Sequence, residues 1–198
     1  MQIELGCGPS LEAGIPPLSQ LHHIYSAADY STGKFLFGED DTLLERVLSD
    51  IGAFYSSAAE PYKTCFLAEL TEFYVLFGKM LKTGKALNPL INNNFDGLAK
   101  LVGFDELYIR RYETSTWIPD IQFDPRAKSL FVVGSHADRR LVRVHAREAG
   151  LQVIYVNPEG YYKDGKFTPH PLEALDANDI LIRMTAAEFA ENLSKILG

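Results

Sequence analysis

Short apolar runs alternate with amphipathic segments along most of this chain. The clearest run, residues 129–133, is a continuous series of β-branched and aromatic residues. Such a run predicts a strand that is buried on both faces, as in the centre of a parallel sheet. Further apolar runs at residues 3–5, 107–109, 153–156 and 179–184 predict additional strands. Because strands alternate with helical segments, we expect an α/β fold with a Rossmann-like, doubly wound and mostly parallel sheet.

Two amphipathic segments predict a helical module at about residues 41–84 inside a single domain spanning residues 1–198. The first helix is expected between Leu43 and Phe54. Pro61 opens the second helix, and Gly84 ends it. The inward face of the second helix is predicted to carry Phe66, Leu70, Phe73, Tyr74, Phe77 and Leu81.

The carboxy-terminal half contains two further helical patterns. The first ends at Gly150, with Leu141 and Val144 expected to face inward. Its solvated face is predicted to carry Arg139, Arg140, Arg143 and Arg147. Thr185 and Glu188 form a capping box that opens the last helix. Its inward residues are predicted to be Phe189, Leu193, Ile196 and Leu197.

Two segments resist a regular assignment. In the apolar run at residues 86–91, Pro89 disfavours an interior strand. Residues 160–171 are rich in turn formers and predict a turn-rich connection.

Composition narrows the classes of function. The net charge of −7 argues against a general nucleic-acid binder, because phosphate contacts need clustered cations. Cys7 and Cys65 are the only cysteines, so a four-cysteine zinc site is excluded and no metal site is expected. His22 and His23 lack a third ligand at a suitable spacing and suit a surface or core position better. No apolar run reaches membrane-spanning length, so we expect a soluble, cytoplasmic protein without a membrane partner.

The segment after the first strand carries the main chemical signal. Gly6 and Gly8 flank Cys7, and Ser10 follows after a proline. Glycines in such a turn leave the backbone bare, so that main-chain N–H groups can converge on a phosphate. The alternative is a strand-to-helix turn that binds nothing. The segment is not the G-x-G-x-x-G dinucleotide motif, because Leu11 occupies the position of the third glycine.

Two families use a segment of this kind. Residues 5–9 look like the first motif of methyltransferases that bind S-adenosylmethionine, in which case Asp29 would end the second strand and contact the ribose. Residues 6–16, however, resemble the sirtuin signature G-A-G-x-S-x-x-A-G-I-P, with Cys7 in place of the alanine. Four later segments also resemble sirtuin motifs in the correct order: 92–98 (T-Q-N-I-D-x-L), 118–123 (R-P-D-I-V-F), 133–135 (G-T-S) and 154–159 (I-N-x-E). The methyltransferase pattern gains no support after Asp29.

The sirtuin resemblance implies an NAD site. On the positions that match the family, the residues facing the pyrophosphate would be Gly6, Cys7, Gly8 and Ser10. Those holding the adenosine side would be Gly134, Ser135, Asn157 and Glu159. Those surrounding the nicotinamide and its ribose would be Ile15, Asn94 and Asp96, with Asn94 and Asp96 as the catalytic pair.

The chain also departs from the family. Arg110, Arg111 and Tyr112 occupy the region where sirtuins carry a catalytic histidine in an H-G pair. An arginine stays protonated near neutral pH and cannot act as the general base. The zinc cysteines are missing, and residues 17–19 replace the D-F-R that follows the first motif. These departures argue against deacetylation of protein lysines.

Three hypotheses remain open at this point. The first is an enzyme, a hydrolase or transferase, that cleaves NAD at the nicotinamide–ribose bond, with an acylated peptide or another protein as a further partner. The second is a non-catalytic module that binds NAD or ADP-ribose and reports it to a partner. The third and most distant is a methyltransferase that uses S-adenosylmethionine.

Overall fold

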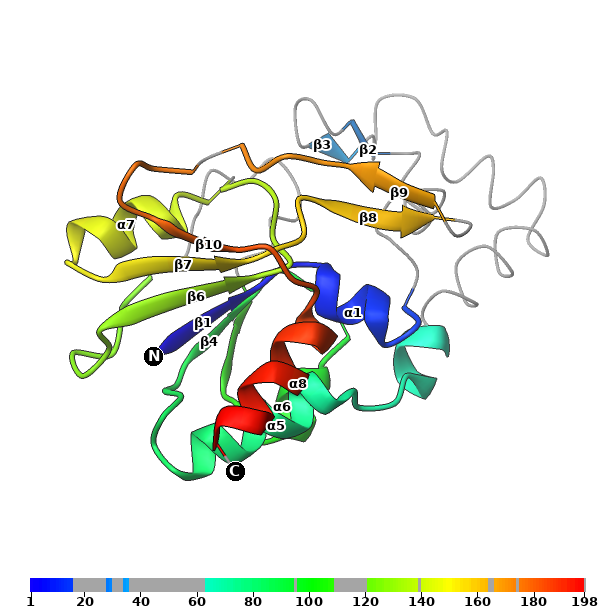
Figure 1. The fold of residues 1–198 in the computed structure, drawn as a ribbon, viewed down its shortest axis with the longest axis horizontal. Helices are drawn as coiled ribbons and strands as arrows, with labels where there is room; N and C mark the ends of the chain where they lie inside the picture. The colour runs from blue at the N-terminus through cyan, green and yellow to red at the C-terminus, as the bar shows by residue number, and fades with distance from the viewer. Residues whose placement is uncertain are drawn as a thin grey trace.

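The protein is built around one six-stranded sheet in which every strand pairing is parallel (Figure 1). The computed structural model describes residues 1–15, 28–29, 34–35, 63–94, 96–108, 121–138, 140–163, 166–173 and 175–197. The sheet order is β10-β7-β6-β1-β4-β5. The strands are β1 (Gln2–Leu5), β4 (Leu90–Asn92), β5 (Glu106–Tyr108), β6 (Ser129–Val133), β7 (Gln152–Val156) and β10 (Ile180–Ile182).

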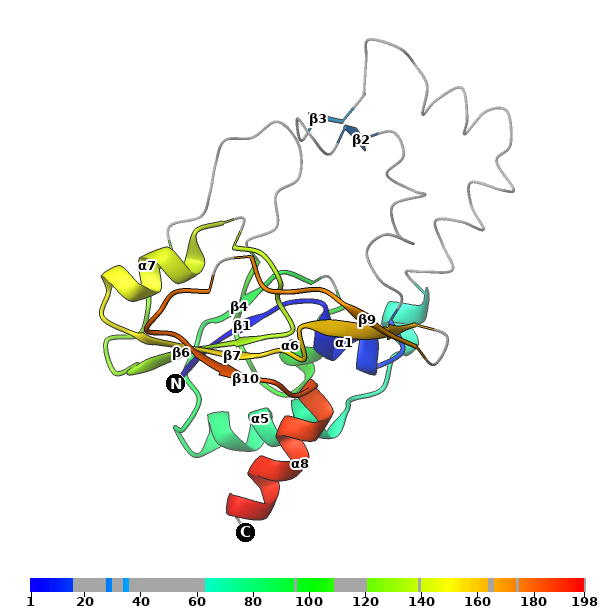
Figure 2. The same cartoon turned by 45° about the horizontal axis from the view of Figure 1, so that its top comes forward.

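The helices cover both faces of this sheet. Figure 2 shows α5 and α8 on one face and α7 on the other. The described helices are α1 (Gly8–Glu12), α5 (Glu72–Lys82), α6 (Leu98–Leu101), α7 (Val142–Glu148) and α8 (Ala186–Leu197). The predicted doubly wound α/β fold is therefore confirmed. Strand order reverses where β1 lies between β4 and β6, which is the position at which such sheets bind ligands.

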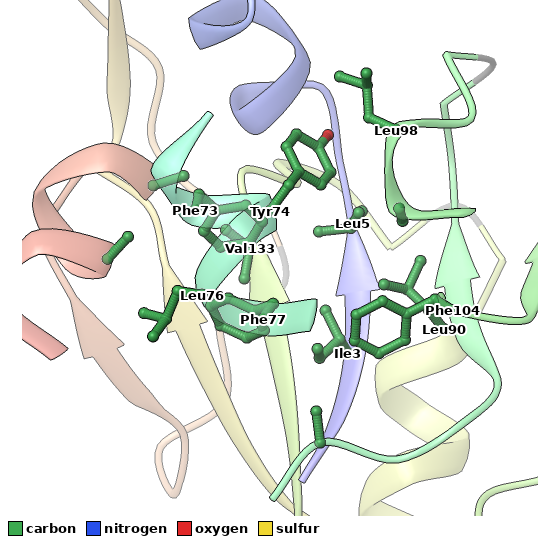
Figure 3. Packing of buried hydrophobic residues seen from close by; sticks show 14 of the residues in the cluster. Ile3, Leu5, Phe73, Tyr74, Leu76, Phe77, Leu90, Leu98, Phe104 and Val133 are labelled. Atoms are coloured by element: carbon green, nitrogen blue, oxygen red, sulfur yellow. The ribbon is translucent and has the colours of Figure 1, made fainter. Parts of the chain in front are cut away.

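Two buried clusters correspond to the two faces. On the larger one, Ile3 and Leu5 of β1 face the α5 residues Phe73, Tyr74 and Phe77, all 2% exposed or less (Figure 3). On the opposite face, the second cluster unites residues of β4, β6, β7 and α7. Side chains alternate along each central strand, and β6 packs apolar side chains on both faces as its sequence predicted. In β1 one face is apolar, with Ile3 and Leu5, whereas the other carries the buried polar side chains of Gln2 and Glu4.

The predicted helix from Pro61 to Gly84 is interrupted. Residues 63–67 are helical, residues 68–71 are not, and α5 begins at Glu72 after Thr71 takes an extended conformation. Phe73, Tyr74 and Phe77 are buried as expected, but Phe66 is 88% exposed, because it belongs to the separate first segment. The predicted helix between Leu43 and Phe54 lies outside the described residues.

Helix α7 is oriented differently from the prediction. Leu141 has a positive φ of 57° and precedes the helix, and Asp138 Oδ2 caps it by accepting the backbone N–H groups of Arg143 (3.0 Å) and Val144 (3.3 Å). With this start, Val142, Arg143 and Ala146 face the sheet, whereas Leu141 and Val144 are partly exposed. The expectation that Arg143 lies on a solvated face was wrong.

Three other local predictions can be compared with the structure. The strand β4 begins directly after Pro89 and lies between β1 and β5, so the run before Asn92 does supply an interior strand. The turn-rich segment contains a hairpin of β8 (Gly160–Lys163) and β9 (Lys166–Pro169). Ile196 is 79% exposed rather than inward.

The predicted capping box at the start of α8 is confirmed. The backbone N–H of Thr185 donates to the carboxylate of Glu188 (2.8 Å), and the backbone N–H of Glu188 donates to Thr185 Oγ1 (3.2 Å).

No helix in the described part of the chain is long and apolar enough to cross a lipid bilayer. A further antiparallel pair, β2 (Ala28–Asp29) with β3 (Lys34–Phe35), is separate from the main sheet.

Arg143 enters the core to pair with a carboxylate from the middle of the sheet. Its Nε lies 3.2 Å from Oε2 of Glu4, and its Nη2 lies 3.3 Å from Oε1. The Arg143 side chain is 0% exposed and that of Glu4 is 2% exposed. Burial raises the pKa of Glu4, whereas the adjacent guanidinium acts to lower it. Each charge therefore depends on the other for compensation.

We expect Arg143→Leu to destabilise the protein by about 3–5 kcal/mol, because it leaves the Glu4 carboxylate buried without its cation. The exposed pair of Arg126 with Asp124 serves as the control, and Arg126→Leu should change stability little. Urea unfolding of both variants measures the difference. Equal small losses in the two variants would contradict the role assigned to the buried pair.

Candidate functional site

Polar residues and glycines follow the carboxyl ends of four neighbouring strands, β4, β1, β6 and β7. Because the strands are parallel, these ends meet at one edge of the sheet (Figure 1). The structure therefore brings together at this edge the segments that carry the predicted site residues. After β1 these are Gly6, Cys7, Gly8, Ser10 and Ile15; after β4, Asn94 and Asp96; after β6, Gly134 and Ser135; and after β7, Asn157 and Glu159.

The turn after β1 packs directly on the turn after β6. Backbone N–H groups of Gly6 and Gly8 donate to the carbonyls of Val133 (2.9 Å) and Gly134 (3.2 Å). A Cβ at Gly6 would lie 2.4 Å from Gly134 O, and one at Gly134, whose φ is +64°, would lie 2.6 Å from Gly8 Cα. The glycines predicted to leave the backbone bare for a phosphate are thus also needed for packing, because a side chain at Gly6 would clash with the turn after β6.

A cavity of about 300 Å³ opens beside these two turns. Its walls come from the ends of β6 and β7, from α1, from the start of α8 and from the β8–β9 hairpin. The lining residues are Cys7, Gly8, Leu11, Glu12, Gly134, His136, Val156, Asn157, Pro158, Gly160, Tyr161, His170, Thr185 and Ala186. Of the predicted site residues, this set includes Cys7, Gly8, Gly134 and Asn157.

The turn after β7 is held by its own amide side chain. Asn157 Nδ2 donates to the Ser135 carbonyl (3.2 Å), and its Oδ1 accepts the backbone N–H of Glu159 (2.7 Å). Glu159 takes a positive φ of 56°, and its carboxylate accepts a bond from Arg183 Nε (2.8 Å). Asn157 thereby joins the β6 and β7 turns at the mouth of the cavity.

The predicted catalytic pair lies at the end of β4, and neither residue lines the cavity. Asn94 is 8% exposed, and its Nδ2 donates to the Gly6 carbonyl (2.7 Å). Asp96 uses both oxygens: Oδ2 accepts Ser10 Oγ–H (2.5 Å), and Oδ1 accepts the backbone N–H of Leu98 (2.9 Å) at the start of α6. Ser10 is 4% exposed, so its hydroxyl connects α1 to the β4–α6 loop. Ile15 packs within the larger apolar cluster.

Cys7 lines the cavity and carries a free thiol. Its Sγ lies 3.9 Å from the Gly134 carbonyl, and desolvation of the sulfur raises its pKa although the residue retains an exposed surface. A raised pKa disfavours the thiolate, which is the nucleophilic form of cysteine.

Sequence reasoning missed three residues of the cavity wall as a group. The rings of His136 and His170 stack with centroids 3.5 Å apart, and Tyr161 meets His170 edge-on at 6.3 Å. His136 Nε2 lies 3.1 Å from Glu173 Oε1. Burial and the nearby His136 lower the pKa of His170. Only the position of His136 just after the strongest strand gave a signal in the sequence.

Glu12 is a further residue that the sequence did not single out. Its two carboxylate oxygens accept the backbone N–H groups of Ala186 (2.9 Å) and Ala187 (2.7 Å), so it caps α8 from the floor of the cavity. Burial raises the pKa of Glu12, and these two bonds partly offset the rise.

Several predicted features lie outside the described residues: His22, His23, the segment 17–19, Arg110, Arg111, Tyr112 and residues 118–120. Within the described ranges, no three histidine, cysteine or acidic side chains are arranged to hold a metal ion. Asp29 belongs to β2, which pairs with β3 alone and is not a strand of the parallel sheet. The methyltransferase hypothesis required Asp29 at a strand end of that sheet.

Solved sirtuin structures share the fold of the whole chain. A structure titled as a Sir2 homolog–NAD complex is 16% identical, with a TM-score of 0.60 over 99% of this chain and 88% of that one. A structure titled as Sir2 with p53 peptide and NAD⁺ is 15% identical, with a TM-score of 0.61 over 100% and 93%. One titled as Sir2 bound to acetylated peptide is also 15% identical, with a TM-score of 0.62 over the same shares. No protein-family model and no curated protein sequence matches the chain.

We expect Gly134→Ala to destabilise the protein by about 2–4 kcal/mol, because alanine adds both positive-φ strain and a clash with the Gly8 backbone. Gly150→Ala is the matched control: its φ is +78°, but nothing lies within 4 Å of the added Cβ. It should therefore lose only the strain, about 1 kcal/mol. Denaturant unfolding compares the two variants, and equal losses would show that the turns do not pack as described.

Proposed function

We propose that this chain, which has the sirtuin fold, binds NAD across the carboxyl edge of its sheet. The observation that carries the proposal is the cavity at the strand-order reversal, bounded by Gly8, Gly134 and Asn157. The adenosine half would enter this cavity beside the predicted Ser135 and Glu159. The pyrophosphate would lie along the Gly6–Ser10 turn, and the nicotinamide ribose would approach Asn94 and Asp96. Solved sirtuin structures in complex with NAD support the same ligand class.

The reaction that fits these groups is cleavage of the bond between nicotinamide and ribose. Nicotinamide leaves with the bonding electrons, and the ribose gains oxocarbenium character. The oxygen of a water molecule, or of another acceptor hydroxyl, then bonds to the ribose carbon and releases its proton to solvent. Such a reaction depends mainly on positioning and on negative charge close to the ribose. Asn94, held by the Gly6 carbonyl, and Asp96, held by Ser10, are fixed groups of the required kind. Transfer from acetylated lysine would further need a base near the nicotinamide ribose, and we do not propose it.

A second candidate is a non-catalytic module that binds NAD or ADP-ribose. One observation favours it: the bonds of Asp96 to Leu98 and Ser10, and of Asn94 to Gly6, give both residues a structural use without catalysis. The two candidates share the binding site and differ only in turnover.

We expect saturating NAD or ADP-ribose to raise the melting temperature by about 5–10 °C, because a ligand at a hundred times its Kd stabilises a folded protein by about 2.7 kcal/mol. S-adenosylmethionine at the same concentration is the control and should leave the melting temperature unchanged. Differential scanning fluorimetry measures the three ligands together. A shift with S-adenosylmethionine and none with either nucleotide would overturn the proposal.

We expect slow release of nicotinamide from NAD, lost in Asn94→Ala because this variant removes the amide that we propose to contact the ribose. Asn88→Ala is the matched control: Asn88 precedes β4 and bonds to Asp105, away from the site. Chromatographic detection of nicotinamide gives the rates. NAD binding without release would select the non-catalytic module, and release by Asn94→Ala at the wild-type rate would remove Asn94 from the reaction.

A further inference from the structure

The buried Glu4–Arg143 pair lies close to the carboxyl edge of the sheet, because Glu4 is the penultimate residue of the central strand β1. Two charges removed from water pay a desolvation penalty that rivals their attraction, so apolar side chains of similar size would stabilise a core at least as well. Arg143 Nη1 and Asp138 Oδ1 are also buried without a hydrogen-bond partner in the described residues. An arrangement that leaves such groups unpaired is not optimised for stability. The pair therefore calls for another explanation.

Each member of the pair makes a hydrogen bond to one further side chain at the carboxyl edge of the sheet. Arg143 Nη2 donates to the hydroxyl of Ser135, and Glu4 Oε1 accepts Asn93 Nδ2 (3.1 Å). Asn93 immediately precedes Asn94, and its Nδ2 and backbone N–H also donate to the Leu5 carbonyl (2.9 and 3.0 Å). Both contacts are made at the ends of strands that carry predicted site residues.

The connections form one path across the sheet. From Ser135 the path continues to Asn157, which donates to the Ser135 carbonyl. It thus runs from the end of β4, through β1 and α7, to the ends of β6 and β7, which lie next to one another in the sheet (Figure 1). The Asn94 segment and the cavity side at Asn157 are thus joined through the buried guanidinium of Arg143, in addition to the contact between the two glycine turns.

We infer that Arg143 is a positioning residue, which sets the Ser135 turn and the Asn93–Asn94 segment relative to each other so that both halves of one dinucleotide can be bound at once. This inference rests on the proposed function. Arg143 is not expected to touch the ligand, and its effect on the site passes through the side chains of Ser135 and Glu4. Its loss should therefore weaken ligand binding even when the fold is retained.

The test replaces both charges together. Glu4→Leu with Arg143→Met removes both charges of the pair, so that neither is left buried without the other, and the fold should be retained. The matched control is Arg147→Met with Asp179→Leu, which removes another α7 pair (Arg147 Nη2 to Asp179 Oδ2, 2.5 Å) just before β10, at the amino edge of the sheet. Isothermal titration with ADP-ribose measures Kd, and urea unfolding measures stability separately.

We expect the Kd of the Glu4→Leu/Arg143→Met variant to rise at least about tenfold while it remains folded, and that of the control variant to stay within about twofold. An unchanged Kd in the first variant would overturn the inference and leave NAD binding intact. Absence of binding by the wild-type protein would overturn the proposed function and this inference together.

If the Glu4→Leu/Arg143→Met variant does not fold, a double-mutant cycle decides. Ser135→Ala and Asn93→Ala each remove one outer contact of the pair. The fold-change in Kd of the double variant should differ from the product of the two single fold-changes by about threefold or more. The control cycle combines Ser135→Ala with Asn88→Ala, which should multiply. Independent effects in both cycles would overturn the inference.

Discussion

The close approach of two glycine turns is the constraint on which the rest of this site depends. The turn after β1 and the turn after β6 are in backbone contact, and a single Cβ at Gly6 or Gly134 would enter the space of the other turn. This contact places the cavity wall at Gly134 against Gly8 and Pro9 at the start of α1, and the Ser10 hydroxyl of the same helix donates to Asp96. Strand order, the cavity and the predicted catalytic residues are thus arranged around one backbone-to-backbone contact.

Polar side chains then fix what the glycines bring together. Asn94 holds the Gly6 carbonyl, Asn157 holds the Ser135 carbonyl, and the Glu4–Arg143 pair connects the segments from below. At this edge of the sheet, amide and charged side chains fix neighbouring segments to one another. In the larger core around Phe73 and Phe77, apolar packing has that role (Figure 3). Directional bonds specify geometry more narrowly than apolar contacts do, which suits a site that must hold a ligand at several points.

The sequence contained enough information for the architecture and for the edge where the site lies. Continuous apolar runs such as residues 129–133 identify buried parallel strands, and the Thr185–Glu188 capping box identifies the start of α8, because both signals are local. The orientation of α7, in contrast, is not determined by a local sequence signal alone. It depends on Asp138 capping the helix and on Glu4, which lies 139 residues away in the chain and accepts Arg143. An arginine in an amphipathic pattern looks exposed unless its distant partner is known.

The candidate site also combines features with a local sequence signal and features that depend on distant contacts. Glycines and amides at strand ends were recognisable from their positions, whereas the stack of His136 on His170 was not, since it requires the β8–β9 hairpin to fold back over the end of β6. The break before α5 was missed for a related reason: the apolar spacing continues through residues 68–71 although the helix does not.

The central claim is that the adenosine half of a dinucleotide occupies the cavity between α1, the ends of β6 and β7, and the β8–β9 hairpin. A crystal structure of the protein with ADP-ribose tests it most directly. In this crystal structure the adenosine should lie against Gly134 and Asn157, with the pyrophosphate along the Gly6–Ser10 turn. Adenosine bound elsewhere on the protein, with this cavity left empty at saturating ligand, would contradict it.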